Sequence, residues 1–412
     1  MNVARRNFTA IYISHLSTAV GMAAFIPFIP YYMTELGVAG EAERGVWAGL
    51  IMGAAPLMAA VFGPIWGALS DRVGRKIMVL RSLVAITVFV GLMAVVVAPW
   101  QMLLLRLLQG VFSGFVAAGN TLVSVSTPVE RQGRTLGVLQ TGLLTGFAIG
   151  PVLGGLVGDA VGYRPVFLVT AGLAASAFVL VALLAREDRD AVQPACDDRG
   201  LVHGMARDLL GTLAGSEMRS FLGSLFTFQA GLSLILPVLP LYLIEVGGYP
   251  EEYQSTVAAL LFVAVAVPLV VCVAPWGRRA DFHGPGRTFV LCTLLAGVLF
   301  LPYVLAGSAL VLIVMRVVHG VFLAGVMPAA YAAVARLTHE FGRGASMGLT
   351  QSAMQFAIAF GAAAGGALAA LVGARVLFLI AGLLVLGAAG LGRLGWVRHV
   401  DWVQSRVGSA GG

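Results

Sequence analysis

The chain has 412 residues, of which 59% are hydrophobic and only 11% are charged, and its mean hydropathy is +0.93. This composition leaves too little polar surface to cover a soluble globule of that length, so it predicts a protein that crosses a membrane many times. The formal net charge of +7 does not indicate nucleic-acid binding, because the basic residues lie mostly in short links between apolar runs. The cysteines, Cys196, Cys272 and Cys292, lack metal-binding or redox spacing, and we expect neither a metal nor a cofactor.

The apolar runs predict twelve membrane-spanning helices, because each is long enough to cross the hydrocarbon core. Arg5 and Arg6 precede the first run as in a signal peptide, but that run continues to Tyr32 without a clear cleavage site, so we expect it to be retained. The predicted fold is an all-α membrane protein with two six-helix bundles, 1–185 and 220–412, joined by a linker at 186–219. The predicted spans are 8–33, 46–69, 77–98, 100–124, 136–158, 165–185, 220–244, 255–275, 288–306, 308–335, 345–371 and 375–396.

The links between these spans divide into two sides with very different charge. One side holds only Arg44, Arg164 and Arg375, together with several glutamates. Because cytoplasmic loops carry an excess of Lys and Arg, both termini and the linker are predicted to be cytoplasmic in a multi-pass plasma-membrane protein. The basic residues of the predicted cytoplasmic side are Arg5, Arg6, Arg72, Arg75, Lys76, Arg131, Arg134, Arg278, Arg279, Arg287, Arg336, Arg343 and Arg398.

A charged hinge, residues 66–76, joins the second and third spans. Its glycines permit a tight turn, and Asp71 can accept hydrogen bonds from exposed helix-start amides or pair with an arginine. Charge alone is equally consistent with a simple cytoplasmic anchor. The order G-x-L-x-D-R-x-G-R-K, however, resembles the loop signature of the major facilitator superfamily, which implies a cytoplasmic gate. The residues that carry this match are Gly67, Asp71, Arg72, Gly74, Arg75 and Lys76.

The two halves repeat one another with a period near 210 residues. Trp66, Gly67, Asp71 and Gly74 recur as Trp276, Gly277, Asp281 and Gly284; Arg106 and Gly110 recur as Arg316 and Gly320. Pro27, Pro30 and Tyr32 recur as Pro237, Pro240 and Tyr242, and the prolines resemble a first-span motif that implies a bend at the outer gate. Such repeats predict two bundles related by an axis along the membrane normal, with a central site between them.

Glycines recur every four residues along the fifth predicted span, and this spacing lays a flat ridge on one helix face. A ridge of this kind is often only a packing seam. The fuller string resembles the antiporter motif of the drug:proton antiporter branch of the superfamily, in which Pro151 invites a bend. On the eleventh span Ala362 replaces the proline. The residues of the motif are Gly146, Gly150, Pro151, Gly154 and Gly155.

Arg106, Gln109 and Gly110 on the fourth span resemble the R-x-x-Q-G motif of the same branch, which implies that Arg106 takes part in proton transfer by tuning a neighbour. The alternative is that Arg106 extends toward the outer interface. No Asp or Glu lies near the middle of a predicted span. The candidate proton carriers are therefore His15 and His319, because histidine titrates near neutral pH, although an intramembrane histidine is often only a packing residue. Glu35, Glu245, Asp71 and Glu130 are the alternatives.

These features predict a proton-coupled exporter of small, largely hydrophobic or amphiphilic compounds, drugs included, that acts as a monomer in the bilayer. The same fold could instead take up or exchange a metabolite, and a non-transporting receptor or scaffold is a third possibility. An enzyme is not expected, because no nucleophile elbow, phosphate loop or metal-ligand set is present in the sequence. The predicted cavity residues are Phe25, Phe28, Tyr31, Phe228, Gln229, Gln351, Met354 and Gln355.

Overall fold

The computed structural model describes residues 3–187, 215–337 and 343–397, so most of the predicted linker lies outside the described residues. Within these ranges the chain is almost entirely helical and contains no strand. The elements are α1 (Val3–Ala24), η1 (Ile26–Phe28), α2 (Ile29–Glu35), α3 (Glu41–Val73), α4 (Arg75–Leu92), η2 (Met93–Val95), α5 (Pro99–Val111), α6 (Phe115–Val125), α7 (Val129–Val161), α8 (Arg164–Leu184), α10 (Ser216–Leu234), α11 (Leu239–Val246), η4 (Glu251–Tyr253), α12 (Gln254–His283), α13 (Pro285–Phe300), η5 (Leu301–Leu305), α14 (Ala309–Leu337), α15 (Arg343–Gly392) and η7 (Arg393–Val397).

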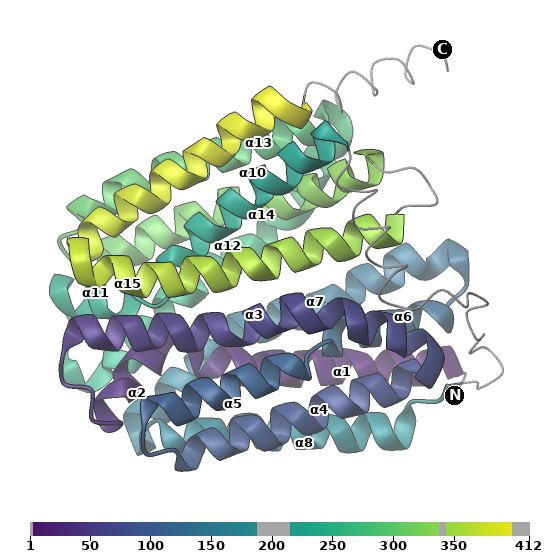
Figure 1. Ribbon diagram of the computed structural model, residues 1–412, viewed down its shortest axis with the longest axis horizontal. Helices are drawn as coiled ribbons and strands as arrows, with labels where there is room; N and C mark the ends of the chain where they lie inside the picture. The colour runs from purple at the N-terminus through teal and green to yellow at the C-terminus, as the bar shows by residue number, and fades with distance from the viewer. Residues whose placement is uncertain (1–2, 188–214, 338–342, 398–412) are drawn as a thin grey trace.

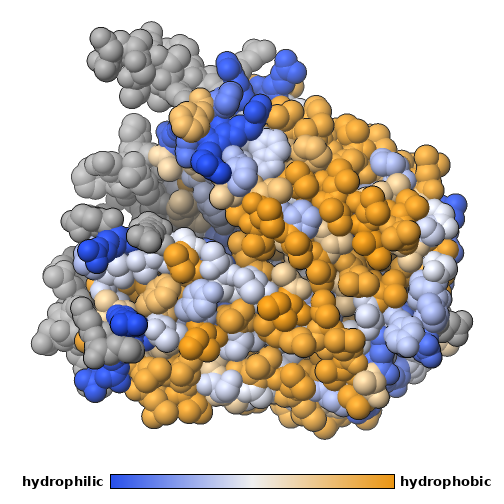
Figure 2. Space-filling model, turned by 180° about the vertical axis from the view of Figure 1, so that it is seen from behind, coloured by the Kyte–Doolittle hydropathy of each residue, from blue (hydrophilic) through white to orange (hydrophobic). Residues whose placement is uncertain are grey.

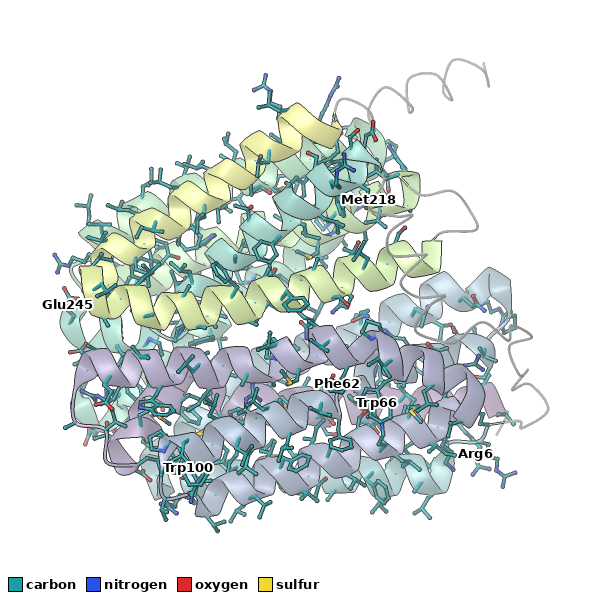
Figure 3. All side chains as sticks on the ribbon, viewed as in Figure 1. Arg6, Phe62, Trp66, Trp100, Met218 and Glu245 are labelled. Atoms are coloured by element: carbon teal, nitrogen blue, oxygen red, sulfur yellow. The ribbon has the colours of Figure 1, made fainter. Side chains whose placement is uncertain are left out.

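The helices form two stacked groups with roughly parallel axes, α1–α8 and α10–η7, and α3 and α15 lie side by side where the groups meet (Figure 1). We name the two ends of the molecule by residues that Figure 3 labels at opposite ends, the Arg6 end and the Glu245 end. The face in Figure 2 is broadly hydrophobic, with hydrophilic side chains gathered toward the two ends. An apolar belt between polar ends is the surface that a bilayer requires.

The number of helical passes is consistent with the predicted twelve spans. In the described part of the chain, ten helices are long and apolar enough to cross a membrane, and eleven if the α10–α11 pair, bent by 43°, counts as one span. The last of them covers 52 residues, Ser346–Val397, and contains Gly373 in a non-helical conformation with φ 80° and ψ 161°. Because the chain turns at this glycine, the segment accommodates two of the predicted spans.

One helix break was not predicted. The fourth span is divided into α5 and α6 at Phe112–Gly114, where Gly114 has a φ of 112°. The break frees the Ser113 carbonyl, which accepts a hydrogen bond of 2.7 Å from Arg81 Nη2. The Arg81 guanidinium also lies 3.6 Å from the centre of the Trp66 ring. A basic side chain from α4 therefore stabilises the interruption.

The internal repeat is confirmed by matching hydrogen bonds in the two halves. Each half uses a tryptophan indole and a tyrosine hydroxyl to hold the backbone of another helix at the same sequence separation. The bonds are Trp66 Nε1 to Val111 O (2.6 Å) and Trp276 Nε1 to Val321 O (2.7 Å), then Tyr32 OH to Met93 O (3.2 Å) and Tyr242 OH to Tyr303 O (2.9 Å).

The glycine ridge of α7 packs directly on α1. A Cβ atom at Gly146 would lie 2.7 Å from Leu16 O, and one at Gly150 or Gly154 would collide with the α1 backbone. Gly155 faces the other half instead, where its Cβ would lie 2.9 Å from Thr256 Cα on α12. Backbones approach this closely only where side chains are absent.

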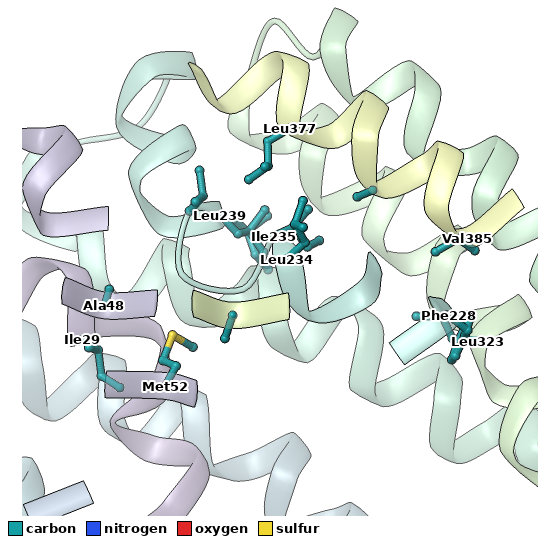
Figure 4. Packing of buried hydrophobic residues seen from close by; sticks show 14 of the residues in the cluster. Ile29, Ala48, Met52, Phe228, Leu234, Ile235, Leu239, Leu323, Leu377 and Val385 are labelled. Atoms are coloured by element: carbon teal, nitrogen blue, oxygen red, sulfur yellow. The ribbon is translucent and has the colours of Figure 1, made fainter. Parts of the chain in front are cut away.

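The equivalent ridge on α15 follows the same plan. Gly361 and Gly365 lie against the backbone of α10, whereas Gly366 lies against Gly45 and Val46 at the start of α3. One buried apolar cluster extends across this boundary and includes residues of both halves (Figure 4). The ridges therefore join helices within each half and, one residue farther on, join the halves to each other.

Candidate functional site: a cavity between the halves

A cavity of about 320 Å³ lies between the two groups of helices. Residues of α1, η1 and α7 bound it on one side, and residues of α10, α12, α14 and α15 on the other. Its wall is mainly apolar, and its polar side chains are Gln229, Ser233 and Arg316. None of its described lining residues is an Asp or a Glu. Pockets for small molecules are typically apolar with a few placed polar groups.

The halves are closed against one another at the Glu245 end. Gly53 of α3 lies so near α15 that a Cβ would stand 2.7 Å from Ala359 O, and Gly49 meets Ala362 O even more closely. Farther along α3, a Cβ at Gly63 or Gly67 would have no neighbour within 4 Å. Direct backbone packing between α3 and α15 thus closes the two halves against each other toward the Glu245 end.

On the opposite flank of the same end, a carboxylate joins the halves. Asp159 near the end of α7 accepts hydrogen bonds from Ser255 N (3.0 Å), Thr256 N (2.9 Å) and Thr256 Oγ1 (2.6 Å). Both amides belong to the first turn of α12, where unpaired N–H groups and the helix dipole favour a negative charge. The sequence alone did not indicate this contact.

Tyr163 and two ion pairs also lie at the Glu245 end. The Tyr163 hydroxyl lies 3.2 Å from Ser255 Oγ, and burial raises the pKa of this hydroxyl, so it stays neutral. Glu35 pairs with Arg164 at 3.8 Å, and Glu245 pairs with Arg375 at 2.9 Å. Each pair lies within one half and is partly exposed, so its contribution to stability is small.

Arg106 is fully enclosed in the first half. Its Nε donates to Ile51 O at 3.2 Å and its Nη1 donates to Gln109 Oε1 at 2.8 Å. The guanidinium carbon lies 5.5 Å from the centre of the Phe25 ring, within the range of a cation–π interaction. Arg106 and Gln109 therefore form one buried unit, and neither lines the cavity described above.

Arg316 occupies the equivalent position in the second half but has a different partner set. Its Nε donates to Leu261 O at 3.1 Å, while its Nη1 has no hydrogen-bond partner among the described residues. His319, which takes the place of Gln109, lies with Nδ1 3.3 Å from the Tyr303 hydroxyl and packs its ring edge-on against Phe300. Arg316 lines the cavity and His319 does not.

His15 lies within the first half rather than on the cavity wall. Its side chain is fully buried and packs against Phe115, with ring centres 4.9 Å apart. Nε2 would be 2.7 Å from a Cβ at Gly119, so this glycine makes room for the ring. Neither ring nitrogen has a hydrogen-bond partner among the residues described.

The charged hinge contains the expected tight turn. Gly74 has a φ of 107°, and its counterpart Gly284 has a φ of 93°. The start of α4 is capped by Glu187, which the sequence analysis missed: its carboxylate accepts from Arg75 N at 2.8 Å and from Lys76 N at 2.9 Å. Lys76 Nζ donates to Ala182 O and Ala185 O at the end of α8.

The two acidic residues of the predicted gate occupy equivalent places. Asp71 and Arg72 belong to the last turn of α3, and their side chains lie outside the described part of the structure. Asp281 is exposed near the end of α12.

The predicted cavity residues separate into groups. Phe228, Gln229 and Met354 line the cavity, as does Pro151 of the ridge. Phe25 and Phe28 are buried against Phe167 and Tyr163, respectively. Tyr31 donates to Pro240 O at 2.6 Å and borders a second cavity of about 690 Å³ at the Glu245 end. Gln351 is exposed and Gln355 is half-buried, and neither lines the first cavity.

Comparisons with known proteins agree with this architecture. The multidrug resistance protein MdtG of Serratia proteamaculans (strain 568) is 30% identical over 383 residues, which cover 93% of this chain and 92% of the relative. The protein of the same name from Citrobacter koseri is 30% identical over 386 residues, 93% of each chain. The crystal structure of a D-xylose-proton symporter superposes with a TM-score of 0.75 at 14% identity, over 95% of this chain and 96% of that chain, and shows the fold alone.

The family model described as the Major Facilitator Superfamily matches residues 11–255 and 221–401, nearly the whole chain. The match includes the hinge, the arginines and the glycine ridges on which the resemblance rested. The chain belongs to the Major Facilitator Superfamily, a family of membrane transporters.

Proposed function

We propose that this protein exports small, largely hydrophobic or amphiphilic compounds, drugs included, in exchange for protons. The observation that carries the proposal is the cavity, which is bounded by helices of both halves, while the halves themselves are in direct contact toward the Glu245 end. A site with such walls can change its access when the halves rock against each other. The names of the two relatives support efflux of drugs.

The proposed orientation places the Arg6 end on the cytoplasmic side of the inner membrane, and both termini lie on that side. The basic residues of the sequence concentrate in the links at that end, as the positive-inside rule requires. The structure then corresponds to a transporter closed toward the outside. The monomer is the proposed working unit, because the cavity is formed by one chain.

His15 is the proposed proton carrier, and the arginine motifs are proposed to assist it. Both nitrogens of His15 lack partners in the described residues, so the ring is available to bind a proton when water reaches it. Arg106 with Gln109, and Arg316 with His319, place permanent charge and hydrogen-bonding groups inside the bundles.

Everted membrane vesicles provide the test. The vesicles are prepared from cells that produce the protein. When a pH gradient is present, they should accumulate the neutral hydrophobic dye N-phenyl-1-naphthylamine. A protonophore should abolish the accumulation, and vesicles without the protein should show none of it. Dye uptake that is insensitive to the gradient would contradict proton coupling, and no uptake of any compound in a hydrophobic panel would contradict efflux.

A further inference from the structure

The second cavity, of about 690 Å³ at the Glu245 end, has walls from both halves. The first half contributes Glu35 and Arg44, and the second half contributes Ile244 and Gln254. Arg44 and Gln254 occupy equivalent positions of the internal repeat. The cavity therefore lies where the two halves meet, and its wall is complete only while they are together at this end.

Arg44 places a positive charge on this wall. Its Nη1 donates to Thr34 Oγ1 at 3.1 Å, and this contact with a neutral hydroxyl is exposed. No carboxylate of the described residues forms an ion pair with Arg44, Glu35 included. The Nη end of the guanidinium can therefore bind an anionic group that enters the cavity.

Glu35 places a negative charge on the same wall and differs in this from its repeat counterpart Glu245. Glu245 accepts a hydrogen bond of 2.9 Å from Arg375 and does not line the cavity. Glu35 lies 3.8 Å from Arg164, too far for a hydrogen bond, and 38% of its side chain is exposed. The carboxylate of Glu35 is therefore accessible to a cationic group in the cavity.

Three tyrosines, Tyr31, Tyr163 and Tyr249, also line the cavity. The Tyr31 hydroxyl donates to Pro240 O, and the Tyr163 hydroxyl lies 3.2 Å from Ser255 Oγ. Both rings are thus held by contacts that cross between the halves. Aromatic rings pack well against another ring and attract an ammonium group over their faces.

We propose that this cavity is a second binding site, for a small aromatic zwitterion of the amino-acid class. The ligand carboxylate binds Arg44, its ammonium group binds Glu35, and its ring packs among the tyrosines. The site is separate from the central cavity, because no described residue lines both. Its volume is within the range of small-molecule pockets, roughly 300–1,000 Å³. Since both halves form the wall, the ligand binds the closed form more tightly and stabilises it.

Binding of tritiated L-phenylalanine tests the site. It is measured by scintillation proximity on the full chain, in nanodiscs of phosphatidylglycerol, whose head group carries no amine. Phenethylamine lacks the carboxylate and 3-phenylpropionate lacks the ammonium group, so each should compete more weakly than unlabelled L-phenylalanine. Equal competition by all three compounds, or no binding of L-phenylalanine, would overturn the proposal.

Two variants and a matched control assign the charges. Arg44→Gln, which copies the residue of the second half, and Glu35→Gln should each weaken L-phenylalanine binding about 10-fold, the value of a hydrogen bond to a charged group. Arg44→Gln should leave competition by phenethylamine unchanged, and Glu35→Gln should leave that by 3-phenylpropionate unchanged, which also shows that the variants fold. Glu245→Gln is the control and should bind like the wild type. An equal loss in Glu35→Gln and Glu245→Gln would contradict the assignment.

Everted vesicles test the stabilisation of the closed form, and this test alone rests on the proposed function. The Glu245 end faces the vesicle lumen in the proposed orientation, so L-phenylalanine loaded into the lumen should slow dye accumulation, and Glu35→Gln vesicles should be less sensitive. Selective binding without this inhibition would overturn the stabilisation of the closed form. Selective binding by a protein that accumulates no dye at all would support the site and contradict the efflux function.

Discussion

The two buried histidines have different surroundings. His15 has no hydrogen-bond partner among the described residues and lies between Phe115 and Gly119. His319 lies beside the Tyr303 hydroxyl and one helical turn from Arg316. A proton on His15 would therefore meet no nearby permanent charge on its own helix, whereas one on His319 would be opposed by the guanidinium.

Replacing each histidine in turn with alanine tests which of the two carries the proton. His15→Ala should uncouple export from the pH gradient while dye binding persists, and His319→Ala should affect coupling less. Flux in vesicles and binding in nanodiscs should be measured separately on both sides of neutral pH. If His15→Ala retains full gradient-driven export, the proton is carried elsewhere, and the carboxylates Glu35 and Asp71 are the next candidates.

Sequence could identify the buried arginines and histidines, because polar residues inside apolar spans are few and costly. It could not identify Asp159 or Glu187. Both lie at the ends of predicted spans, where acidic residues are common and local pattern is uninformative. Their role depends on which helix start lies opposite, and only tertiary packing decides that.

At the scale of helices, the ridge on α7 can be tested with a matched pair of glycines. Gly150→Leu inserts a side chain where a Cβ already collides with the α1 backbone. Overpacking of this kind typically costs about 1–3 kcal/mol, so the thermal midpoint and transport should both fall.

The control is Gly137→Leu on the same helix, where a Cβ would have open space. That variant should keep wild-type stability in the same thermal-shift measurement. A Gly150→Leu protein that matched Gly137→Leu in stability and flux would show that α1 and α7 need not touch.

Asp159 is expected to hold α12 against α7 while the Glu245 end is closed. Asp159→Asn keeps the side-chain volume, but the amide nitrogen cannot accept from a backbone N–H. Hydrogen bonds to a charged group contribute about 1.5–3 kcal/mol, so the closed form should become at least several-fold less populated. Distances between spin labels at Glu41 and Glu252, one in each half, measure this opening.

Glu35→Gln is the matched control, because it removes a carboxylate at the same end whose ion pair with Arg164 lies within one half. Its distance distribution should stay that of the wild type. If Asp159→Asn does not shift the distribution toward longer distances, the three hydrogen bonds do not determine closure.

Helix positions followed from the apolar runs, and the repeat followed from paired motifs, because both depend on local pattern. The division of the fourth span into α5 and α6 did not. A single Gly114 in an apolar run is compatible with a continuous helix. The break also needs Arg81, thirty-two positions before Ser113, to satisfy the Ser113 carbonyl. The equivalent helix of the second half, α14, is continuous, so comparison of the two halves does not predict a break in the fourth span.

For the molecule as a whole, the proposed orientation predicts which end meets the outside. A cysteine that replaces Glu41, exposed at the start of α3, should react with impermeant maleimide in intact cells. A cysteine at Arg189, which lies outside the described residues, should react only after the membrane is opened. The reverse labelling pattern would show that the protein has the opposite orientation in the membrane.

Alternating access requires the halves to separate at the Glu245 end during each cycle. Gly158 of α7 and Ser255 of α12 face each other there, and a Cβ at Gly158 would lie 3.6 Å from Ser255 Cβ. Cysteines at Gly158 and Ser255, in a chain whose native cysteines are replaced, should therefore form a disulfide on oxidation. The linked protein should lose most of its export, because the halves can no longer separate at that end.

Binding should survive in the linked protein, because the cavity wall is unchanged. Reduction should restore export, and the two single-cysteine variants should be insensitive to the oxidant. These controls separate the effect of the link from the effect of added side chains in a tight interface. Full export by the linked protein would mean that α7 and α12 stay together throughout the cycle. The cargo would then have to leave along the other flank, between α3 and α15.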